Sequence, residues 1–348
     1  MKILITGNLG YVGPGLVRAF HHHDPDSKIC GFDIGYFARQ LTTTSISPDA
    51  LLHAQYYGDV RDFPQQILSG VDVVVSLAAI SNDPIGNKYE IPTMQVNYEA
   101  NIRIAELAKQ MGVRRFVFAS SCSVYGAAED APRKEDSSLN PLTAYAKSKI
   151  NSEQALQSLA SPEFQVTCLR FATACGMSER LRLDLVLNDF VAGAMSAGLI
   201  DILSDGTPWR PLIHVLDMAR AIVWASARSD DQGGHFLTIN TGSNIWNYQV
   251  KDLAFAVKEV MPQVQVRINE NAAPDKRSYR VDFDLFERLA PHHQPQYTLE
   301  NTISHLKQGL ESIHFNDSSF REGELMRLNV IRALRNSQTI DTGLRLTI

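Results

Sequence analysis

The sequence predicts an α/β protein built on a doubly wound parallel sheet, with a smaller, mixed C-terminal domain. Two observations carry this prediction. Short apolar runs rich in β-branched residues alternate with longer stretches of helical period, and these runs are apolar throughout. Strands of a parallel sheet have this composition because helices cover both faces of the sheet. At 348 residues the chain is also long for one compact core, so a second domain is expected.

The apolar runs and helical patterns follow one another in a regular order up to Gly176. The runs lie at 3–6, 28–33, 71–77, 115–120 and 165–170, and the helical patterns lie at about 11–22, 94–111, 143–160 and 183–198. Beyond Gly176 the rhythm changes, but a helical stretch at about 213–228 and a strand-like stretch at 235–240 return to it. We therefore expect one domain from 1–176 plus about 213–245, and a substrate domain from 177–212 and 246–348.

Composition and charge narrow the possible partners. The chain is 44% hydrophobic and 20% charged, and its formal net charge is -5, with both signs mixed along its length. This balance is typical of globular proteins and disfavours nucleic acid or an anionic membrane as the main partner. The N-terminus begins directly with strand-like residues, and no apolar run reaches the ~18 residues of a membrane span. We expect a soluble, cytoplasmic protein.

Cysteines and histidines give no indication of a disulfide framework or a metal site. The four cysteines form no CxxC pair, and three lie in apolar, strand-like stretches, so we expect buried reduced thiols. They are Cys30, Cys122, Cys168 and Cys175. The histidine run 21–23 falls where the first helix ends. Consecutive helical residues point in different directions, so these three cannot share one metal ion, and we expect no metal.

A glycine-rich turn follows the first strand and precedes the first helix. Its residues are Gly7, Asn8, Leu9, Gly10, Tyr11, Val12 and Gly13. Glycine allows a tight turn, close approach of the backbone to a pyrophosphate, and close packing of helix on strand. The helix N-terminus then presents N–H groups and a positive dipole end to phosphates. We expect these residues to bind a dinucleotide on a Rossmann-type sheet.

Asp33 indicates which dinucleotide binds. It ends the second strand, 20 residues beyond Gly13. A carboxylate at that point can accept hydrogen bonds from both hydroxyls of the adenosine ribose and repels a 2′-phosphate, so NAD is favoured over NADP. The glycine spacing is GxxGxxG, one residue longer than the general fingerprint, and it resembles that of the extended short-chain dehydrogenase/reductase family.

This resemblance implies further cofactor-binding residues. Gly58-Asp59-Val60 matches the segment whose aspartate contacts the adenine in the family. Asn97 matches a family asparagine that buttresses the active site. The remaining residues implied to lie beside the cofactor are Val60, Leu77, Ala78 and Ala79.

Tyr145 and Lys149 form a YxxxK motif in a stretch of helical period. Residues four apart share one helix face, whereas Lys147 points away. A tyrosine with a pKa of ~10 is a poor base at neutral pH, and a neighbouring ammonium stabilises its phenolate. Upstream, 118–126 resembles the family motif whose serine or threonine completes the catalytic group, and the matching residue is Ser121. The resemblance thus implies Ser121, Tyr145 and Lys149 as catalytic residues, with Tyr145 and Lys149 also contacting the cofactor.

The second domain resembles that of nucleotide-sugar epimerases and dehydratases. The segment 205–217 looks like the family's nucleotide-binding segment, and 274–279 like its second phosphate-binding segment. Arg210 and Arg277 are the matching cations, and a diphosphate requires such a pair. The other residues implied to contact the substrate are Ser81, Asn82, Ser121, Cys122, Ser123, Thr173 and Asn188. The implied partner is a nucleotide-diphosphate sugar.

Two departures from the family pattern bear on the reaction. In 4,6-dehydratases an aspartate and a glutamate follow the catalytic threonine, whereas Cys122 and Ser123 stand here. This disfavours 4,6-dehydration. Thr173 replaces a common asparagine, so sugar contacts in its region do not transfer directly. Epimerisation at C4 needs no acid or base beyond Tyr145, and we take it as the first hypothesis.

Other readings remain open. An NAD(P)-dependent oxidoreductase or ketoreductase acting on a nucleotide-linked keto-sugar is the alternative enzyme, although Asp33 argues against NADPH. A catalytically inactive, cofactor-sensing relative would usually lack one of the three catalytic residues. Oxidation of a small hydroxy acid would not need Arg210 and Arg277. The resemblance further implies a homodimer, in which helices 94–111 and 143–160 pair with those of a second subunit.

Overall fold

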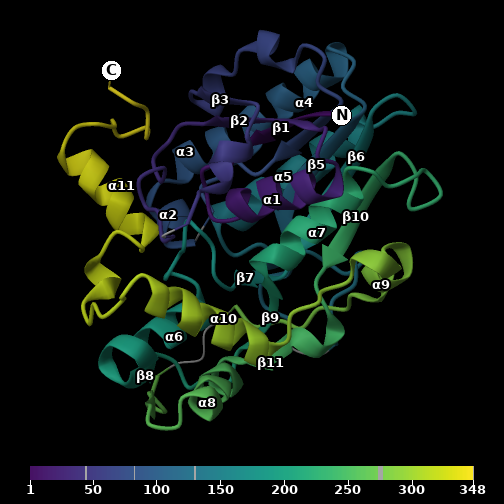
Figure 1. The fold of residues 1–348 in the computed structure, drawn as a ribbon. Helices are drawn as coiled ribbons and strands as arrows, with labels where there is room; N and C mark the ends of the chain where they lie inside the picture. The colour runs from purple at the N-terminus through teal and green to yellow at the C-terminus, as the bar shows by residue number, and fades with distance from the viewer. Residues whose placement is uncertain (44, 82, 129–130, 273–276, 348) are drawn as a thin grey trace.

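The computed structural model describes residues 1–348 apart from 44, 82, 129–130, 273–276 and 348. Its larger part is a seven-stranded parallel sheet in the order β10-β6-β5-β4-β1-β2-β3 (Figure 1). The strands are β1 (Lys2–Thr6), β2 (Lys28–Asp33), β3 (Ala54–Tyr57), β4 (Val73–Ser76), β5 (Arg115–Ser121), β6 (Gln165–Phe171) and β10 (Phe236–Thr241). The predicted fold class is confirmed.

Helices cover both faces of this sheet, which explains why its strands are apolar throughout. Ile3 and Ile5 of β1 pack in one core with α1 (Gly13–His23) and α7 (Val215–Ala225). Leu4 between them packs in another core with α4 (Ala100–Gln110) and α5 (Ala144–Leu159). Successive side chains of a strand point to opposite faces, so a strand buried on both sides has no polar alternation.

The edge strand β3 has no counterpart among the predicted apolar runs. Its residues Ala54, Gln55, Tyr56 and Tyr57 are half-buried or exposed. A strand at the edge of a sheet is not enclosed on both faces, and its sequence therefore lacks the continuous apolar run of the central strands.

The smaller part of the chain contains two short sheets and three principal helices. β7 (Thr173–Cys175) pairs in parallel with β9 (Trp209–His214), which pairs antiparallel with β11 (Asn247–Gln249). β8 (Leu199–Ile202) pairs in parallel with β12 (Gln265–Ile268). One core joins these sheets to α6 (Val186–Ala197), α8 (Val250–Val260) and α10 (Leu299–Ser312). The remaining helices include α2 (Asp83–Lys88), α3 (Glu90–Met94), the π-helical turn η4 (Gln95–Glu99) and α9 (Asp284–Leu289).

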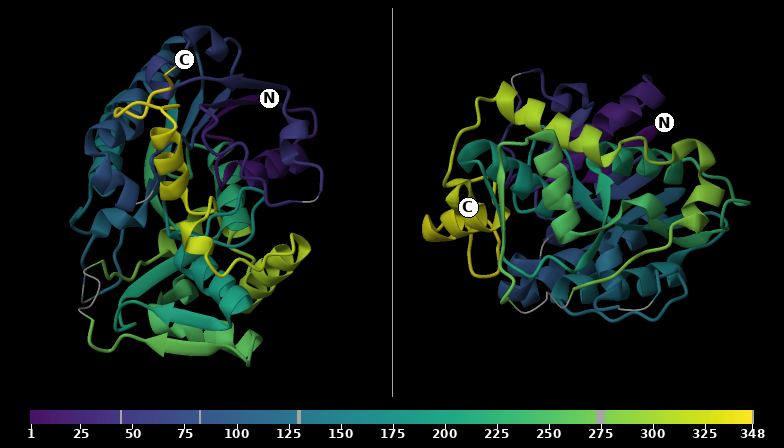
Figure 2. Two further views of the ribbon diagram at one scale, coloured as in Figure 1. Left: turned by 90° about the vertical axis from the view of Figure 1, so that its left-hand side faces the viewer. Right: turned by 90° about the horizontal axis from the view of Figure 1, so that it is seen from below.

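The end of the chain returns to the large sheet. Helix α11 (Arg327–Asn336) and the segment after it lie at the edge of the molecule, beside α2 in Figure 1 and in yellow, facing the viewer, in the left view of Figure 2. Ile331, Ile340 and Leu344 form a small core with Ile85 of α2. None of the helices in the described part of the chain is long and apolar enough to cross a membrane. The four cysteines are buried and unpaired, as predicted.

Candidate active site

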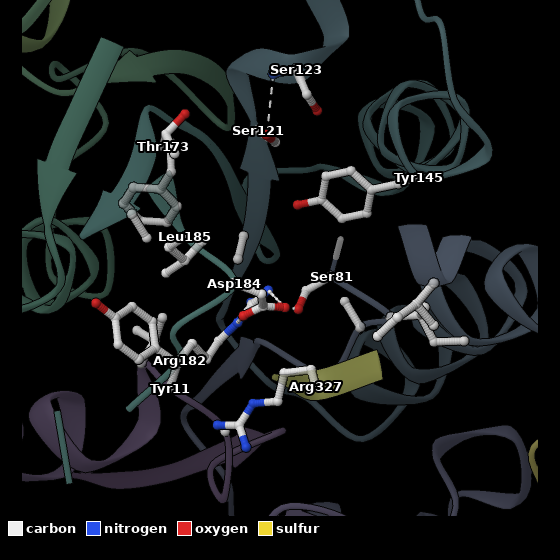
Figure 3. A pocket seen from close by; sticks show the side chains of 18 of the residues that line it. Tyr11, Ser81, Ser121, Ser123, Tyr145, Thr173, Arg182, Asp184, Leu185 and Arg327 are labelled. Atoms are coloured by element: carbon white, nitrogen blue, oxygen red, sulfur yellow. Dashed lines mark hydrogen bonds and ion pairs between the residues drawn. The ribbon is translucent and has the colours of Figure 1, made fainter. Parts of the chain in front are cut away.

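A cavity of about 880 Å³ opens where the carboxyl ends of the parallel strands meet the smaller part of the chain. Ligands of doubly wound sheets bind at this end of the strands. The volume lies near the upper end of the range for ligand sites, roughly 300–1,000 Å³. Figure 3 shows its interior, with Tyr145 and Ser121 above and Arg182, Asp184 and Arg327 below. Residues from both parts of the chain therefore enclose one site.

The glycine turn forms one wall of the cavity and leaves no room for larger residues. Gly7 has a φ of +76°, and a Cβ there would lie 2.5 Å from the backbone nitrogen of Ala78. A Cβ at Gly13 would lie 1.8 Å from the carbonyl oxygen of Asn8. Helix α1 begins at Gly13 without a side-chain cap hydrogen bond, so its N-terminal amides point toward the turn. This cradle fits a pyrophosphate.

Asp33, at the end of β2, is held in place on the same wall. One carboxylate oxygen accepts the backbone N–H of Leu9 at 3.0 Å, and the other accepts that of Gly35 at 2.7 Å. Burial raises the pKa of Asp33, and these two hydrogen bonds oppose the rise. The carboxylate lines the cavity. A fixed acceptor in this position fits the ribose of NAD.

Asp59 also lines the cavity, but its carboxylate already has a partner. The guanidinium of Arg61 donates to both of its oxygens, at 2.9, 3.0 and 2.5 Å. The predicted contacts Val60, Leu77, Ala78 and Ala79 line the cavity as well. Asn8 and Leu9 of the glycine turn are buried and are not among the residues that line the cavity.

Tyr145 and Lys149 share one face of α5, as the motif predicts. The Nζ of Lys149 lies 5.5 Å from the centre of the Tyr145 ring and donates to the carbonyl of Ala119 at 2.6 Å. Burial lowers the pKa of Lys149 to about 8, and the carboxylate of Glu153 opposes this shift. Both residues line the cavity. At neutral pH the ammonium is still present and can stabilise a tyrosinate.

Ser121 ends β5 and also faces the cavity. Its Oγ accepts the backbone N–H of Ser123 at 3.1 Å, which fixes its orientation (Figure 3). The Oγ of Ser123 is buried without a hydrogen-bond partner and belongs to a lining residue. Cys122 between them points into the core, where its thiol donates to the carbonyl of Arg170, and burial raises its pKa. The structure thus places the hydroxyls at the site and the thiol behind it.

Two predicted asparagines are structural neighbours of the site. Asn97 in η4 accepts the backbone N–H of Ile80 at 2.7 Å and donates to the carbonyl of Ile80 at 3.0 Å. This anchors the segment that follows β4. Asn188 is fully buried, donates to Tyr11 and accepts the backbone N–H of Gly176. Its side chain therefore fixes the junction between the two parts of the chain.

Sequence reasoning missed a charged pair beside the predicted catalytic group. Arg182 donates to Asp184 from Nε at 2.9 Å and from Nη2 at 3.1 Å, and its Nη1 donates to Ser81 at 2.9 Å. All three residues line the cavity, together with Thr173. The positive charge of Arg182 acts on Tyr145. The alternation Arg-Leu-Arg-Leu-Asp in 180–184 is the feature that could have drawn attention to this pair.

The predicted phosphate-binding cations lie at the other end of the cavity. Arg210 of β9 and Arg277 both line it, as does Tyr279. Arg210 also donates to the carbonyl of Trp209 at 2.9 Å. The predicted contact Asn82 lies outside the described residues. The cavity therefore has a dinucleotide-shaped wall at one end, a tyrosine–lysine–serine group in the middle, and two arginines from the smaller part at the other.

These features define an NAD-dependent enzyme of the short-chain dehydrogenase type. The sequence matches the NAD dependent epimerase/dehydratase family over residues 3–242, and the chain belongs to that family. The residues described above fit NAD. Asp33 and the glycine turn would hold its adenosine and diphosphate, and Tyr145 and Lys149 would lie beside its reactive ring.

Known relatives agree with this assignment. The chain is similar to the UDP-glucose 4-epimerase of Corynebacterium glutamicum, with 29% identity over 278 residues that cover 75% of this chain and 80% of the relative. Among solved structures, the NAD-dependent NDP-hexosamine 5,6-dehydratase TunA has a TM-score of 0.78 at 23% identity, covering 91% of this chain and 99% of that one. The UDP-glucose-4-epimerase from Stenotrophomonas maltophila, with bound NAD and formylated UDP-arabinopyranose, has a TM-score of 0.77 at 21% identity, covering 90% and 99%. The solved structures share the fold.

Proposed function

We propose that the protein epimerises the C4 centre of a nucleotide-diphosphate sugar through a transient 4-keto intermediate. The observation that carries this proposal is the arrangement along one cavity of the cofactor wall, the Tyr145–Lys149–Ser121 group and the arginines Arg210 and Arg277. Two arginines suit the negative charge of a nucleotide diphosphate. The tyrosine–lysine–serine group in the middle of the cavity suits the oxidation of an alcohol carbon. The curated relative from Corynebacterium glutamicum, named a UDP-glucose 4-epimerase, supports the same reaction.

Tyr145 is the base of the proposed reaction. It takes the proton of the sugar hydroxyl while Lys149 stabilises the developing phenolate, and Ser121 donates a hydrogen bond to the same sugar oxygen. NAD, when bound, supplies reversible oxidation of the alcohol carbon. After the keto-sugar has rotated in the cavity to present its other face, Tyr145 returns the proton to the oxygen. No external reductant is consumed, in keeping with the NAD preference indicated by Asp33.

The residues beside the triad support epimerisation over dehydration. Elimination of water needs an acid and a base in addition to the tyrosine. At the positions where dehydratases carry carboxylates, Cys122 is buried in the core and Ser123 presents a hydroxyl. Asp184 lines the same cavity, but Arg182 holds both of its oxygens. A carboxylate in such a pair is a weak base.

The test is to incubate the protein with UDP-, dTDP-, GDP- and CDP-sugars, adding NAD but no reductant, and to follow products by NMR and mass spectrometry. A product of unchanged mass with an inverted C4 centre is expected, and Tyr145→Phe should form none. A product that has lost water would instead identify the protein as a dehydratase. If no sugar reacts but a 4-keto-sugar is reduced with added NADH, the protein is a ketoreductase.

A further inference from the structure

Arg327 is a buried cation that the mechanism above does not use. It begins α11, where the C-terminal part of the chain returns to the first domain, and its side chain lines the cavity. Arg327 is only 3% exposed. Its Nη2 donates to the carbonyl of Arg180 at 3.0 Å, and its guanidinium carbon lies 4.2 Å from the centre of the Phe37 ring.

One nitrogen of this guanidinium has no hydrogen-bond partner. Nη1 of Arg327 is buried, and nothing in the described part of the chain accepts from it. Buried donors of this kind are rare, because an unsatisfied group costs roughly 1–3 kcal/mol, and more if it is charged. An unpaired donor that belongs to a cavity-lining cation indicates a ligand that accepts hydrogen bonds and carries negative charge.

Two arginines close to Arg327 already have carboxylate partners. Arg180 is paired with Asp49 at 2.6 Å, and Arg182 is paired with Asp184 at 2.9 Å. For Arg327 no carboxylate lies within ion-pair distance among the residues that the structure describes. Burial and the nearby Arg182 lower its pKa to about 9. The charge of Arg327 is thus compensated incompletely until an anion arrives.

The position of Arg327 selects one part of the cofactor. Asp33, which fits the adenosine ribose, acts electrostatically on Arg327, and so does Arg182 beside the catalytic group. Phe37, which its guanidinium covers, follows the Asp33–Gly35 turn. Between the adenosine ribose and the reactive ring, NAD carries a diphosphate. We propose that Arg327 binds the diphosphate of NAD, complementing from the C-terminal segment the backbone amides of the glycine turn.

The segment after α11 is fastened to the cofactor domain, which keeps Arg327 in this position. Arg61 donates to the carbonyls of Gly343 and Leu344, both at 2.7 Å. The hydroxyl of Tyr36 donates to the same Leu344 carbonyl at 2.7 Å. Tyr36, Arg61 and Leu344 also line the cavity. NAD bound here would be enclosed by the C-terminal segment and would leave slowly. The inference rests on NAD dependence and not on the proposed C4 epimerisation.

Binding measurements on the full-length chain freed of nucleotide test this inference. Arg327→Gln removes the charge at the site, and Arg332→Gln removes one from the exposed side of the same helix as a matched control. We expect Arg327→Gln to weaken NAD and ADP by roughly ten- to a hundredfold, the loss of a charge-assisted hydrogen bond. Both variants should bind adenosine, which lacks the diphosphate, with the same affinity as the parent protein. Arg327→Lys should recover part of the affinity for NAD and ADP.

Two results would overturn the inference. One is unchanged NAD and ADP binding by Arg327→Gln. The other is an equal loss for adenosine, which would make Arg327 a packing residue. Thermal unfolding of the nucleotide-free variants controls for folding. If Arg327→Gln does not fold, Arg327→Lys carries the test, because a lysine cannot reproduce the two-nitrogen fork. It should lose affinity for ADP while retaining that for adenosine, and an equal loss for both ligands contradicts the proposal.

Discussion

Lys149 shows how burial prepares a single residue for chemistry. Its ammonium is enclosed, 3% exposed, between the Ala119 carbonyl and the faces of Phe118 and Tyr145. The Phe118 ring centre lies 4.6 Å from Nζ. Burial lowers the pKa of Lys149 from 10.5 to about 8, so the charge persists at neutral pH but is lost in mildly alkaline solution. The charge that assists Tyr145 is therefore sensitive to pH.

Replacing Lys149 tests its proposed role in catalysis. Lys149→Met should lower kcat by roughly 10²- to 10⁴-fold at pH 7, since the phenolate of Tyr145 loses its stabilising charge. The parent protein should lose activity above about pH 8, where it loses the ammonium. The residual activity of the variant should not fall in this range. A pH–rate profile of both proteins provides the measurement. Nearly full activity in the variant would remove Lys149 from the mechanism.

The same shift makes a prediction about stability, and its sign is opposite to that of a lysine whose pKa is raised by a salt bridge. Between about pH 8 and 10.5 the unfolded chain holds a proton on Lys149 that the folded chain has released. The free energy of unfolding should therefore rise with pH in this window. From pH 7 to 9.5 the contribution of this lysine is roughly 2 kcal/mol. Urea unfolding of cofactor-free protein should show this component in the parent but not in Lys149→Met.

Motifs identify residues whose chemistry depends on local spacing. Tyr145 and Lys149 lie four apart on a helix, and the glycine turn follows a strand, so the sequence predicts both groups. Arg182 and Arg327 belong to no such pattern, because their positions depend on how distant segments pack. Cys122 and Ser123 are adjacent in sequence, and only the backbone turn after β5 decides that one enters the core and the other the cavity.

At the scale of elements, α11 and the residues after it are the least expected feature. Residues 246–348 are expected in the substrate domain and no helix is predicted at 327–336, because the position of α11 against the first domain depends on long-range contacts. Arg61 makes the most specific of these contacts, since its guanidinium joins Asp59 to two backbone carbonyls near the C-terminus. By contrast, the central strands could be predicted because burial on both faces makes them apolar throughout, and α1, α4 and α5 because each buries one face and so repeats with the helical period.

Arg61→Ala should release the C-terminal segment. The substitution leaves the carbonyl of Gly343 without its donor, the carbonyl of Leu344 with the Tyr36 hydroxyl alone, and Asp59 without its partner. We expect a loss of roughly 1–3 kcal/mol in the free energy of unfolding. Amide hydrogen exchange should increase in 338–346 while that of β1 and β5 is unchanged. Unaltered exchange in 338–346 would show that this anchor does not hold the segment.

At the scale of the whole molecule, one exposed face suits the dimer expected from the family resemblance. A groove between the start of α5 and the α3–η4 region is lined by Ile91, Met94, Ala144 and Lys147, among others, and the Ile91 side chain is 73% exposed. We predict that α4 and α5 pair with their counterparts around this groove. Light scattering should give about twice the chain mass of 38.7 kDa.

A charge placed in this groove tests whether the groove forms the dimer interface. Ile91→Glu should yield a folded monomer, because a buried charge without a partner is costly at an interface. Ile245→Glu is the matched substitution at a similarly exposed isoleucine, 74% exposed, outside the groove, and it should leave the mass unchanged. A parent protein that scatters as a monomer contradicts the predicted dimer.

In the proposed reaction the C4 alcohol of the sugar is oxidised and the 4-keto carbon is then reduced again within one cavity. The most direct test of this reaction is to convert a nucleotide-sugar deuterated at C4 in ordinary water, and in parallel the unlabelled sugar in D₂O, and to locate deuterium in the product by NMR. We predict that the label stays at C4 of the inverted sugar and that no solvent deuterium enters carbon positions. Solvent deuterium at C5 or C6, or loss of the C4 label, would contradict C4 epimerisation.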